Sequence, residues 1–139
     1  MKKALIFALG FIFASSLFAR NDILYFPLKD VLESEKAKEI IDPSIELIFG
    51  SGNTGEIVTK QVRTNKKTNA FGKTDKKACE WALLSALKSL QERAKKDGGT
   101  KVINITGYYY KNEFDSKTEF QCGAGSIMAG VTLIGDVAK

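Results

Sequence analysis

The segment from Lys76 to Lys96 most narrows the folds open to this 139-residue chain. Alanine and leucine recur in it at three- and four-residue spacing, which predicts one helix with a broad apolar face. Thr74 or Asp75 can cap the start of this helix, and Gly98-Gly99 can end it. Since many of the apolar residues are alanines, we expect the helix to pack closely onto a sheet.

Strand signals lie on both sides of that helix. Residues 45–49 and 56–62, with the turn residues Gly50-Ser51-Gly52-Asn53 between them, predict an N-terminal hairpin. Residues 102–110 predict a strand, and residues 118–137 predict a second long strand or a pair of strands.

The other segments are interpreted from their periodicity and their breaker residues. Residues 29–41 have helical spacing and end at Asp42-Pro43, because the residue before a proline avoids the helical region. Residues 65–73 show no periodicity and are expected to form a loop. The predicted fold is therefore α+β: a small antiparallel sheet with one main amphipathic helix packed on it, plus an N-terminal hairpin and a short helix. Residues 20–139 are expected to form a single domain.

Residues 1–19 have the pattern of a secretory signal peptide. Two lysines precede an apolar stretch over residues 4–13, and small residues lead to an expected cut after Ala19. The apolar stretch is too short for a permanent membrane-spanning helix, so no transmembrane segment is expected after cleavage. The mature protein is therefore predicted to be periplasmic or secreted.

The chain has two cysteines, Cys79 and Cys122. An even count in an exported protein favours a disulfide, which here would close a loop of about 43 residues. On the chain-entropy estimate, such a bridge stabilises the fold by about 4 kcal/mol. The alternatives are a metal-binding pair or a redox dithiol. However, the chain has no histidine to complete a zinc site and no Cys-x-x-Cys spacing.

Basic residues are concentrated between residues 60 and 77. Without residues 1–19 the chain has 19 basic and 16 acidic side chains, and this stretch alone carries a net charge of +6. We therefore expect it to attract an anionic partner, such as lipopolysaccharide, another cell-wall component or an acidic face of an envelope protein. The candidate binding residues are Arg63, Lys66, Lys67 and Lys73. The alternative is a solvated, lysine-rich loop.

Three consecutive tyrosines occupy the end of a predicted strand. Strand alternation predicts that Tyr108 and Tyr110 share one face of the sheet and that Tyr109 lies on the other. Tyr108 and Tyr110, exposed beside lysines, could stack on a sugar or contact a protein surface. The alternative is that these rings simply cover a face of the sheet.

The sequence offers few groups for catalysis or for a cofactor. The absence of histidine excludes histidine-based triads and metal schemes. Glu113, Asp115 and Glu119 cluster near a predicted turn, where acids are usually solvated, so neither catalysis nor a metal site is expected. Gly72-Lys73-Thr74 resembles the end of a phosphate-binding loop, but Lys67 stands where that loop needs a glycine. We expect no nucleotide, no cofactor and, since no nucleic-acid module is present, no nucleic acid.

Several short elements of the chain are distinctive. They are Asn65-Lys66-Lys67-Thr68-Asn69, Ala78-Cys79-Glu80-Trp81-Ala82, Tyr108-Tyr109 and Cys122-Gly123-Ala124-Gly125. With them, most of the chain after residue 19 resembles a family of small exported proteobacterial proteins of unassigned function, often labelled "excinuclease ATPase subunit". Roughly the last 65 residues also resemble the helix-strand-strand unit of RcsF-like and YbjQ-like small domains. The resemblance implies an envelope location and no catalytic residues.

These observations predict a non-enzymatic exported envelope protein that binds another protein or an anionic component of the cell envelope. The first alternative is a small secreted or periplasmic inhibitor of an enzyme, because a rigid domain with an exposed loop would also serve that role. A small hydrolase is the second.

Overall fold

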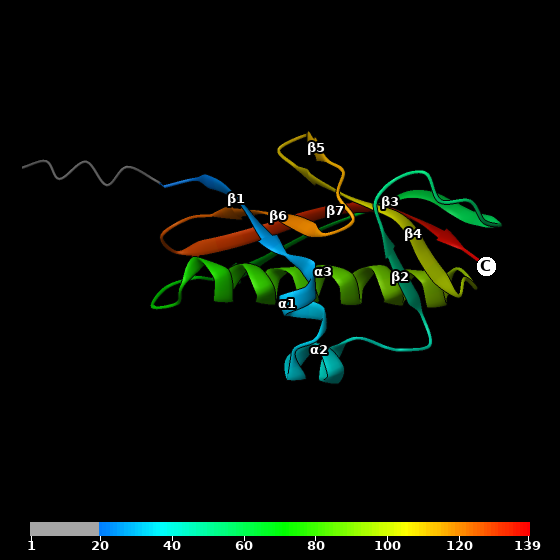
Figure 1. Ribbon diagram of the computed structural model, residues 1–139, viewed down its shortest axis with the longest axis horizontal. Helices are drawn as coiled ribbons and strands as arrows, with labels where there is room; N and C mark the ends of the chain where they lie inside the picture. Colours follow the sequence, from blue (N-terminus) through cyan, green and yellow to red (C-terminus); the bar gives the residue numbers. More distant parts are fainter. Residues whose placement is uncertain (1–19) are drawn as a thin grey trace, which may run out of the picture.

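The computed structural model describes residues 20–139, so the predicted signal peptide lies outside the described residues. One seven-stranded sheet is covered on one side by three helices (Figure 1). In chain order the elements are β1 (Asp22–Pro27), α1 (Leu28–Leu32), α2 (Glu35–Ile40), β2 (Glu46–Phe49), β3 (Ile57–Asn69), α3 (Asp75–Lys96), β4 (Lys101–Tyr109), β5 (Asn112–Phe114), β6 (Glu119–Ala124) and β7 (Met128–Ala138).

Helix α3 confirms the helix predicted from the alanine and leucine spacing. The Thr74 side chain accepts a hydrogen bond from the backbone N–H of Lys77 at 3.2 Å and so caps its first turn. Gly98 follows its last turn with a φ of 76°. This is a left-handed backbone conformation that a residue with a side chain adopts only under strain. The predicted apolar face is fully buried against the sheet.

The sheet is larger than predicted and is not purely antiparallel. Strand β7 lies at its centre: it pairs with β3 along one side and with β6 and then β4 along the other. Strand β1 extends the sheet beyond β6, and β2 pairs with β4 in the parallel direction. Since β2 and β4 are joined through β3 and α3, their parallel pairing is a crossover connection that no hairpin could make.

The predicted N-terminal hairpin is wrong, because β2 and β3 do not pair with each other. Residues 50–56 between them form a loop whose polar groups bond to later parts of the chain. The backbone N–H of Asn53 donates to Asn104 Oδ1 at 2.8 Å, and that of Ser51 donates to Asp115 Oδ1 at 2.9 Å. The loop therefore carries the chain across the sheet, and β3 reaches the longer strand β7.

Two further boundaries differ from the predictions. The predicted loop over residues 65–73 is strand as far as Asn69, because β3 is an edge strand that can be polar and still pair with β7. The predicted helix over residues 29–41 is two short helices, α1 and α2. Ser34 separates them and caps α2 by accepting a hydrogen bond from Ala37 N at 3.1 Å.

The predicted disulfide between Cys79 and Cys122 is confirmed, with an S–S distance of 2.06 Å. It joins the first turns of α3 to β6 and is completely buried. A buried structural disulfide is typical of proteins that fold in an oxidising compartment outside the cytoplasm. Within residues 20–139, no helix has the length and apolar character needed to cross a membrane.

Candidate functional site

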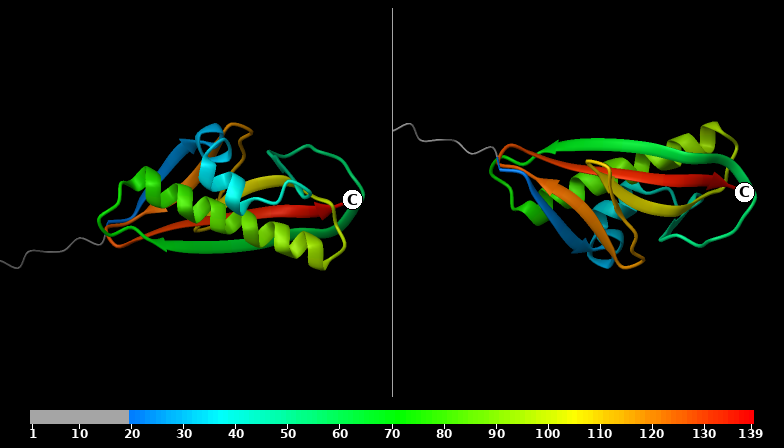
Figure 2. Two further views of the ribbon diagram at one scale, coloured as in Figure 1. Left: turned by 90° about the horizontal axis from the view of Figure 1, so that it is seen from below. Right: turned by 90° about the horizontal axis from the view of Figure 1, so that it is seen from above.

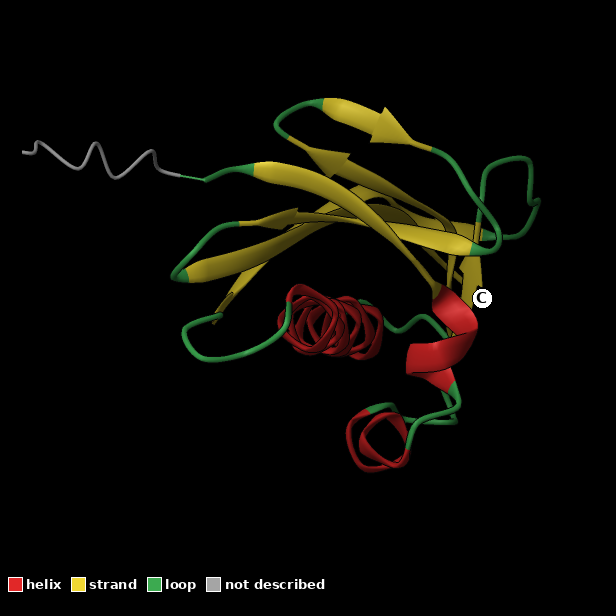
Figure 3. Ribbon diagram, turned by 60° about the vertical axis from the view of Figure 1, so that its left-hand side comes forward, coloured by secondary structure: helices red, strands yellow, loops and turns green. Residues whose placement is uncertain are grey.

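The face of the sheet that the helices leave uncovered is the open face, and it carries the candidate site. Figure 3 shows the helices on one side of the sheet and the hairpin of β4 and β5 rising above the strands on the other side. Cys122 faces α3, so its neighbour Gly123 lies on the open face. Gly123 pairs with Gly130, which in turn pairs with Lys67, so these three residues form a row across that face.

A cavity of about 690 Å³ opens above this row, and we name it the tyrosine hollow. Its lining combines three glycines, two tyrosine rings, two cations and the turn between β6 and β7. The lining residues are Arg20, Asn21, Lys67, Tyr109, Tyr110, Gly123, Gly125, Ser126, Ile127, Met128, Ala129 and Gly130.

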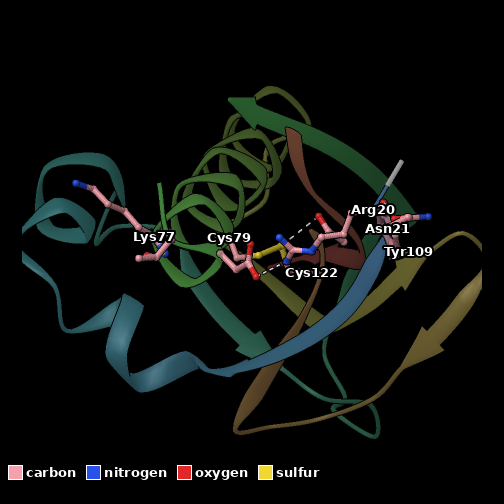
Figure 4. Close-up of a disulfide and its surroundings, with 9 residues drawn as sticks. Arg20, Asn21, Lys77, Cys79, Tyr109 and Cys122 are labelled. Atoms are coloured by element: carbon pink, nitrogen blue, oxygen red, sulfur yellow. Dashed lines mark hydrogen bonds and ion pairs between the residues drawn. A yellow bond between two sulfur atoms is a disulfide. The ribbon is translucent and has the colours of Figure 1, made fainter. Parts of the chain in front are cut away.

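Tyr109 forms one wall of the hollow and lies directly over Gly123. A Cβ atom at Gly123 would lie 1.9 Å from Tyr109 Cζ, so the ring occupies the space that glycine leaves free. The Tyr109 hydroxyl donates a hydrogen bond to Asn21 Oδ1 at 3.1 Å, and burial raises the pKa of this tyrosine above its usual value. Figure 4 shows Tyr109 beside Asn21, next to the Cys79–Cys122 bridge.

The prediction that Tyr108 and Tyr110 share a face is wrong. Strand β4 ends at Tyr109, and Tyr110 and Lys111 form the two-residue turn to β5 with φ values of 46° and 61°. This turn brings the Tyr110 ring to 4.6 Å from the Tyr109 ring, at the rim of the hollow. Tyr108 instead lies under Arg63, whose guanidinium carbon is 4.6 Å from the centre of the ring.

The structure therefore divides the six candidate binding residues into two groups. Arg63 and Tyr108 contact each other in the middle of the sheet. Tyr110 and Lys67 line the tyrosine hollow. Lys66 precedes Lys67 in the same strand and so lies at the same end of the sheet. Its side chain faces the helix side, because Lys66 pairs with the buried Val131. Lys73 follows β3, and its Nζ donates to the carbonyl of Asn69 at 3.0 Å.

We name the region around Lys66, Lys67, Lys73 and the tyrosine hollow the basic end. Two acids also lie there, Asp22 and Asp75, and both form ion pairs with Arg20. Those hydrogen bonds raise the pKa of Arg20, so its charge is permanent but already balanced. By contrast, none of the three lysines forms an ion pair with any acid of residues 20–139. The basic end therefore keeps an excess of positive charge.

A second, more polar cavity of about 450 Å³ lies further along the open face, and sequence reasoning missed it. At its base, Asp136 accepts hydrogen bonds from the backbone N–H of Gln61 at 2.8 Å and from Asn104 Nδ2 at 3.1 Å. Gln61 and Asn104 both have left-handed backbones, with φ values of 51° and 55°, and each lies at a bulge. The carboxylate thus holds two irregular strands in place. The one sequence signal for this irregular region was Asn104, because asparagine is unfavourable inside a predicted strand.

The three acids considered for catalysis have separate surroundings. Glu113 lines the second cavity, while Glu119 begins β6 opposite Pro27. Asp115 accepts hydrogen bonds from the side chain and backbone of Ser51, and these lower its pKa. Asp115 therefore holds the loop after β2 as a charged acceptor.

Comparisons of this chain with protein-family models, with curated proteins and with solved structures found no match. The resemblance to small exported proteobacterial proteins stays a prediction from the sequence elements alone.

Proposed function

We propose that this chain is a non-enzymatic, exported protein of the cell envelope that binds an anionic component of the envelope with its basic end. The observation that carries the proposal is that Lys67 lines the tyrosine hollow and Lys73 is held nearby by its bond to Asn69, while neither lysine has an acidic partner among residues 20–139. Unpaired cations around a concave, partly aromatic surface attract and orient an anionic group.

Two features favour binding over a merely solvated basic surface. Lys67 emerges from a regular strand and Lys73 is tied to Asn69, so the ammonium groups start from fixed backbone. The disulfide braces β6 at Cys122, next to Gly123 in the floor of the hollow, and the hydrogen bond to Asn21 holds the Tyr109 ring. A preformed site loses less entropy on binding than a flexible lysine-rich loop. The role of small inhibitor stays the alternative hypothesis.

The test compares two double charge reversals that change the net charge equally. In Lys67→Glu/Lys73→Glu both changes lie at the basic end. In Lys60→Glu/Lys88→Glu both lie elsewhere, because Lys60 is seven residues back along β3, or about 23 Å. Neither control lysine forms an ion pair within the described residues, and both are exposed.

Binding to purified lipopolysaccharide and to insoluble peptidoglycan is measured at low and at physiological salt. We expect the wild-type chain to bind at least one of them, more weakly as salt rises. The basic-end variant should bind at least roughly 30-fold less tightly, because each lysine near an anionic surface contributes about 1 kcal/mol and the two introduced glutamates add repulsion. The control variant should change affinity by only a few-fold. Equal losses in the two variants, or no binding to either material, would contradict the proposal.

A further inference from the structure

The basic end also exposes large apolar side chains. Phe71 is 76% exposed, Ile127 is 66% exposed and Met128 is 44% exposed, and we name these three residues the apolar tip. Tyr110, 69% exposed, lies at the rim of the adjoining hollow with Ile127 and Met128. Single exposed apolar residues are ordinary, but a group of them on neighbouring turns marks an interaction surface.

Two turns hold the apolar tip at one extremity of the molecule. Phe71 lies in the turn from β3 to α3, and Ile127 lies in the turn from β6 to β7. The backbone N–H of Ala70 donates to the carbonyl of Ile127 at 2.7 Å, which extends the β3–β7 ladder past its last pair, Asn69 with Met128. Both views of Figure 2 show these turns together at one end of the long molecule. The hydrogen bond between the two turns therefore holds the apolar tip in a fixed position at the end of the molecule.

The cations of the basic end adjoin this projection. Lys67 is two residues before the Asn69–Met128 pair, and Lys73 is two residues after Phe71. Asp22 and Asp75, the acids nearby, are both paired with Arg20. An anionic surface that approached the tip would meet unpaired ammonium groups around protruding apolar side chains.

We infer that the apolar tip and the basic end dock on an anionic lipid bilayer, with Phe71 and Ile127 entering the interface and the lysines contacting headgroups. This inference rests on the proposed function, because it names the anionic component. A protruding apolar tip suits a bilayer, which deforms around inserted side chains, whereas a protein partner would need a matching concave pocket.

Flotation with lipid vesicles tests the inference on residues 20–139. Vesicles of phosphatidylcholine with phosphatidylglycerol are compared with vesicles of phosphatidylcholine alone. We expect binding to the anionic vesicles only. The substitutions Phe71→Ser and Ile127→Ser should each weaken it by about tenfold or more, since a buried apolar side chain contributes at least that much. Val58→Ser is the matched control, because Val58 is exposed near the far end of β3.

A second measurement reports insertion directly. Phe71→Trp in a Trp81→Phe background places the sole tryptophan at the tip, and Val58→Trp in the same background is its control. Brominated lipids should quench the tryptophan at position 71 and leave the one at position 58 unquenched. Binding that survives both serine substitutions, or no quenching at position 71, overturns the inference. If lipopolysaccharide or peptidoglycan still binds in a Lys67- and Lys73-dependent way, the proposed function stands without it.

Discussion

The packing of the Tyr109 ring over Gly123 allows a direct test of how the tyrosine hollow is formed. A Cβ atom at Gly123 would lie 1.9 Å from Tyr109 Cζ and 2.1 Å from its hydroxyl oxygen, far inside van der Waals contact. Gly130, its cross-strand partner, is the matched control. A Cβ atom there would lie 3.4 Å from Lys67 Cγ and 3.5 Å from Tyr109 Cε2, which is ordinary contact. Gly123→Ala should therefore expel the ring, and Gly130→Ala should not.

The expected cost follows from what the ring loses. An expelled Tyr109 gives up part of its buried area, its hydrogen bond to Asn21 and its contact with Tyr110. These losses amount to about 1–2 kcal/mol for a side chain that is only partly buried. Replacing glycine by alanine in a strand is itself favourable by about 0.5–1 kcal/mol, but this gain is common to both variants. Gly123→Ala should thus be about 1–2 kcal/mol less stable than Gly130→Ala, or about 3–10 °C lower in Tm.

Thermal unfolding followed by circular dichroism measures the gap, and a Tyr109→Ala background tests its cause. If the ring is the obstacle, the difference between the two alanine variants should shrink to within about 0.5 kcal/mol once Tyr109 is truncated. Two results would refute the reasoning: equal Tm values in the presence of Tyr109, or a difference that persists without it.

Two other predictions concern the support of α3. Gln91, 2% exposed, accepts from the backbone N–H of Asp42 and donates to the carbonyls of Asp42 and Ile45. Gln91→Leu should therefore cost about 2–4 kcal/mol in urea unfolding, while Ser85→Ala, exposed on the same helix, should cost under about 0.5 kcal/mol. The disulfide spans 43 residues, so the free energy of unfolding of Cys79→Ala/Cys122→Ala should be about 3–4 kcal/mol lower than that of the wild type. Equal stability of the oxidised and the reduced wild-type protein would contradict this prediction.

The features predicted correctly depend on local or compositional signals. The start, end and apolar face of α3 are encoded within the helix and its flanking residues, and pairing of two cysteines needs only their even number in an exported chain. The pairing of β2 and β3 was mispredicted because partner choice is not local. Gly50 and Gly52 do adopt positive φ values, but a turn of this kind serves a crossing loop as well as a hairpin.

The candidate site was predicted only where charge revealed it. Lys66, Lys67 and Lys73 were found by counting cations, and the structure gathers them at one end. Phe71 and Ile127 were missed, because a lone apolar residue in a polar turn gives no periodic signal of exposure. The positions of the tyrosines were mispredicted since Tyr110 and Lys111 form a turn that usually needs asparagine and glycine.

The basic stretch between residues 60 and 77 acquires two separable roles once most of it is recognised as a strand. Strand β3 is a 13-residue edge that carries four cations and no acid, so two copies placed edge to edge would repel each other. This protection needs charge anywhere along the edge, Lys60 and Arg63 included. Binding of an anion needs charge at one place, beside the hollow and the apolar tip. Because only binding depends on where along the strand the charge lies, the paired charge reversals distinguish a binding site from a general protection of the edge against pairing.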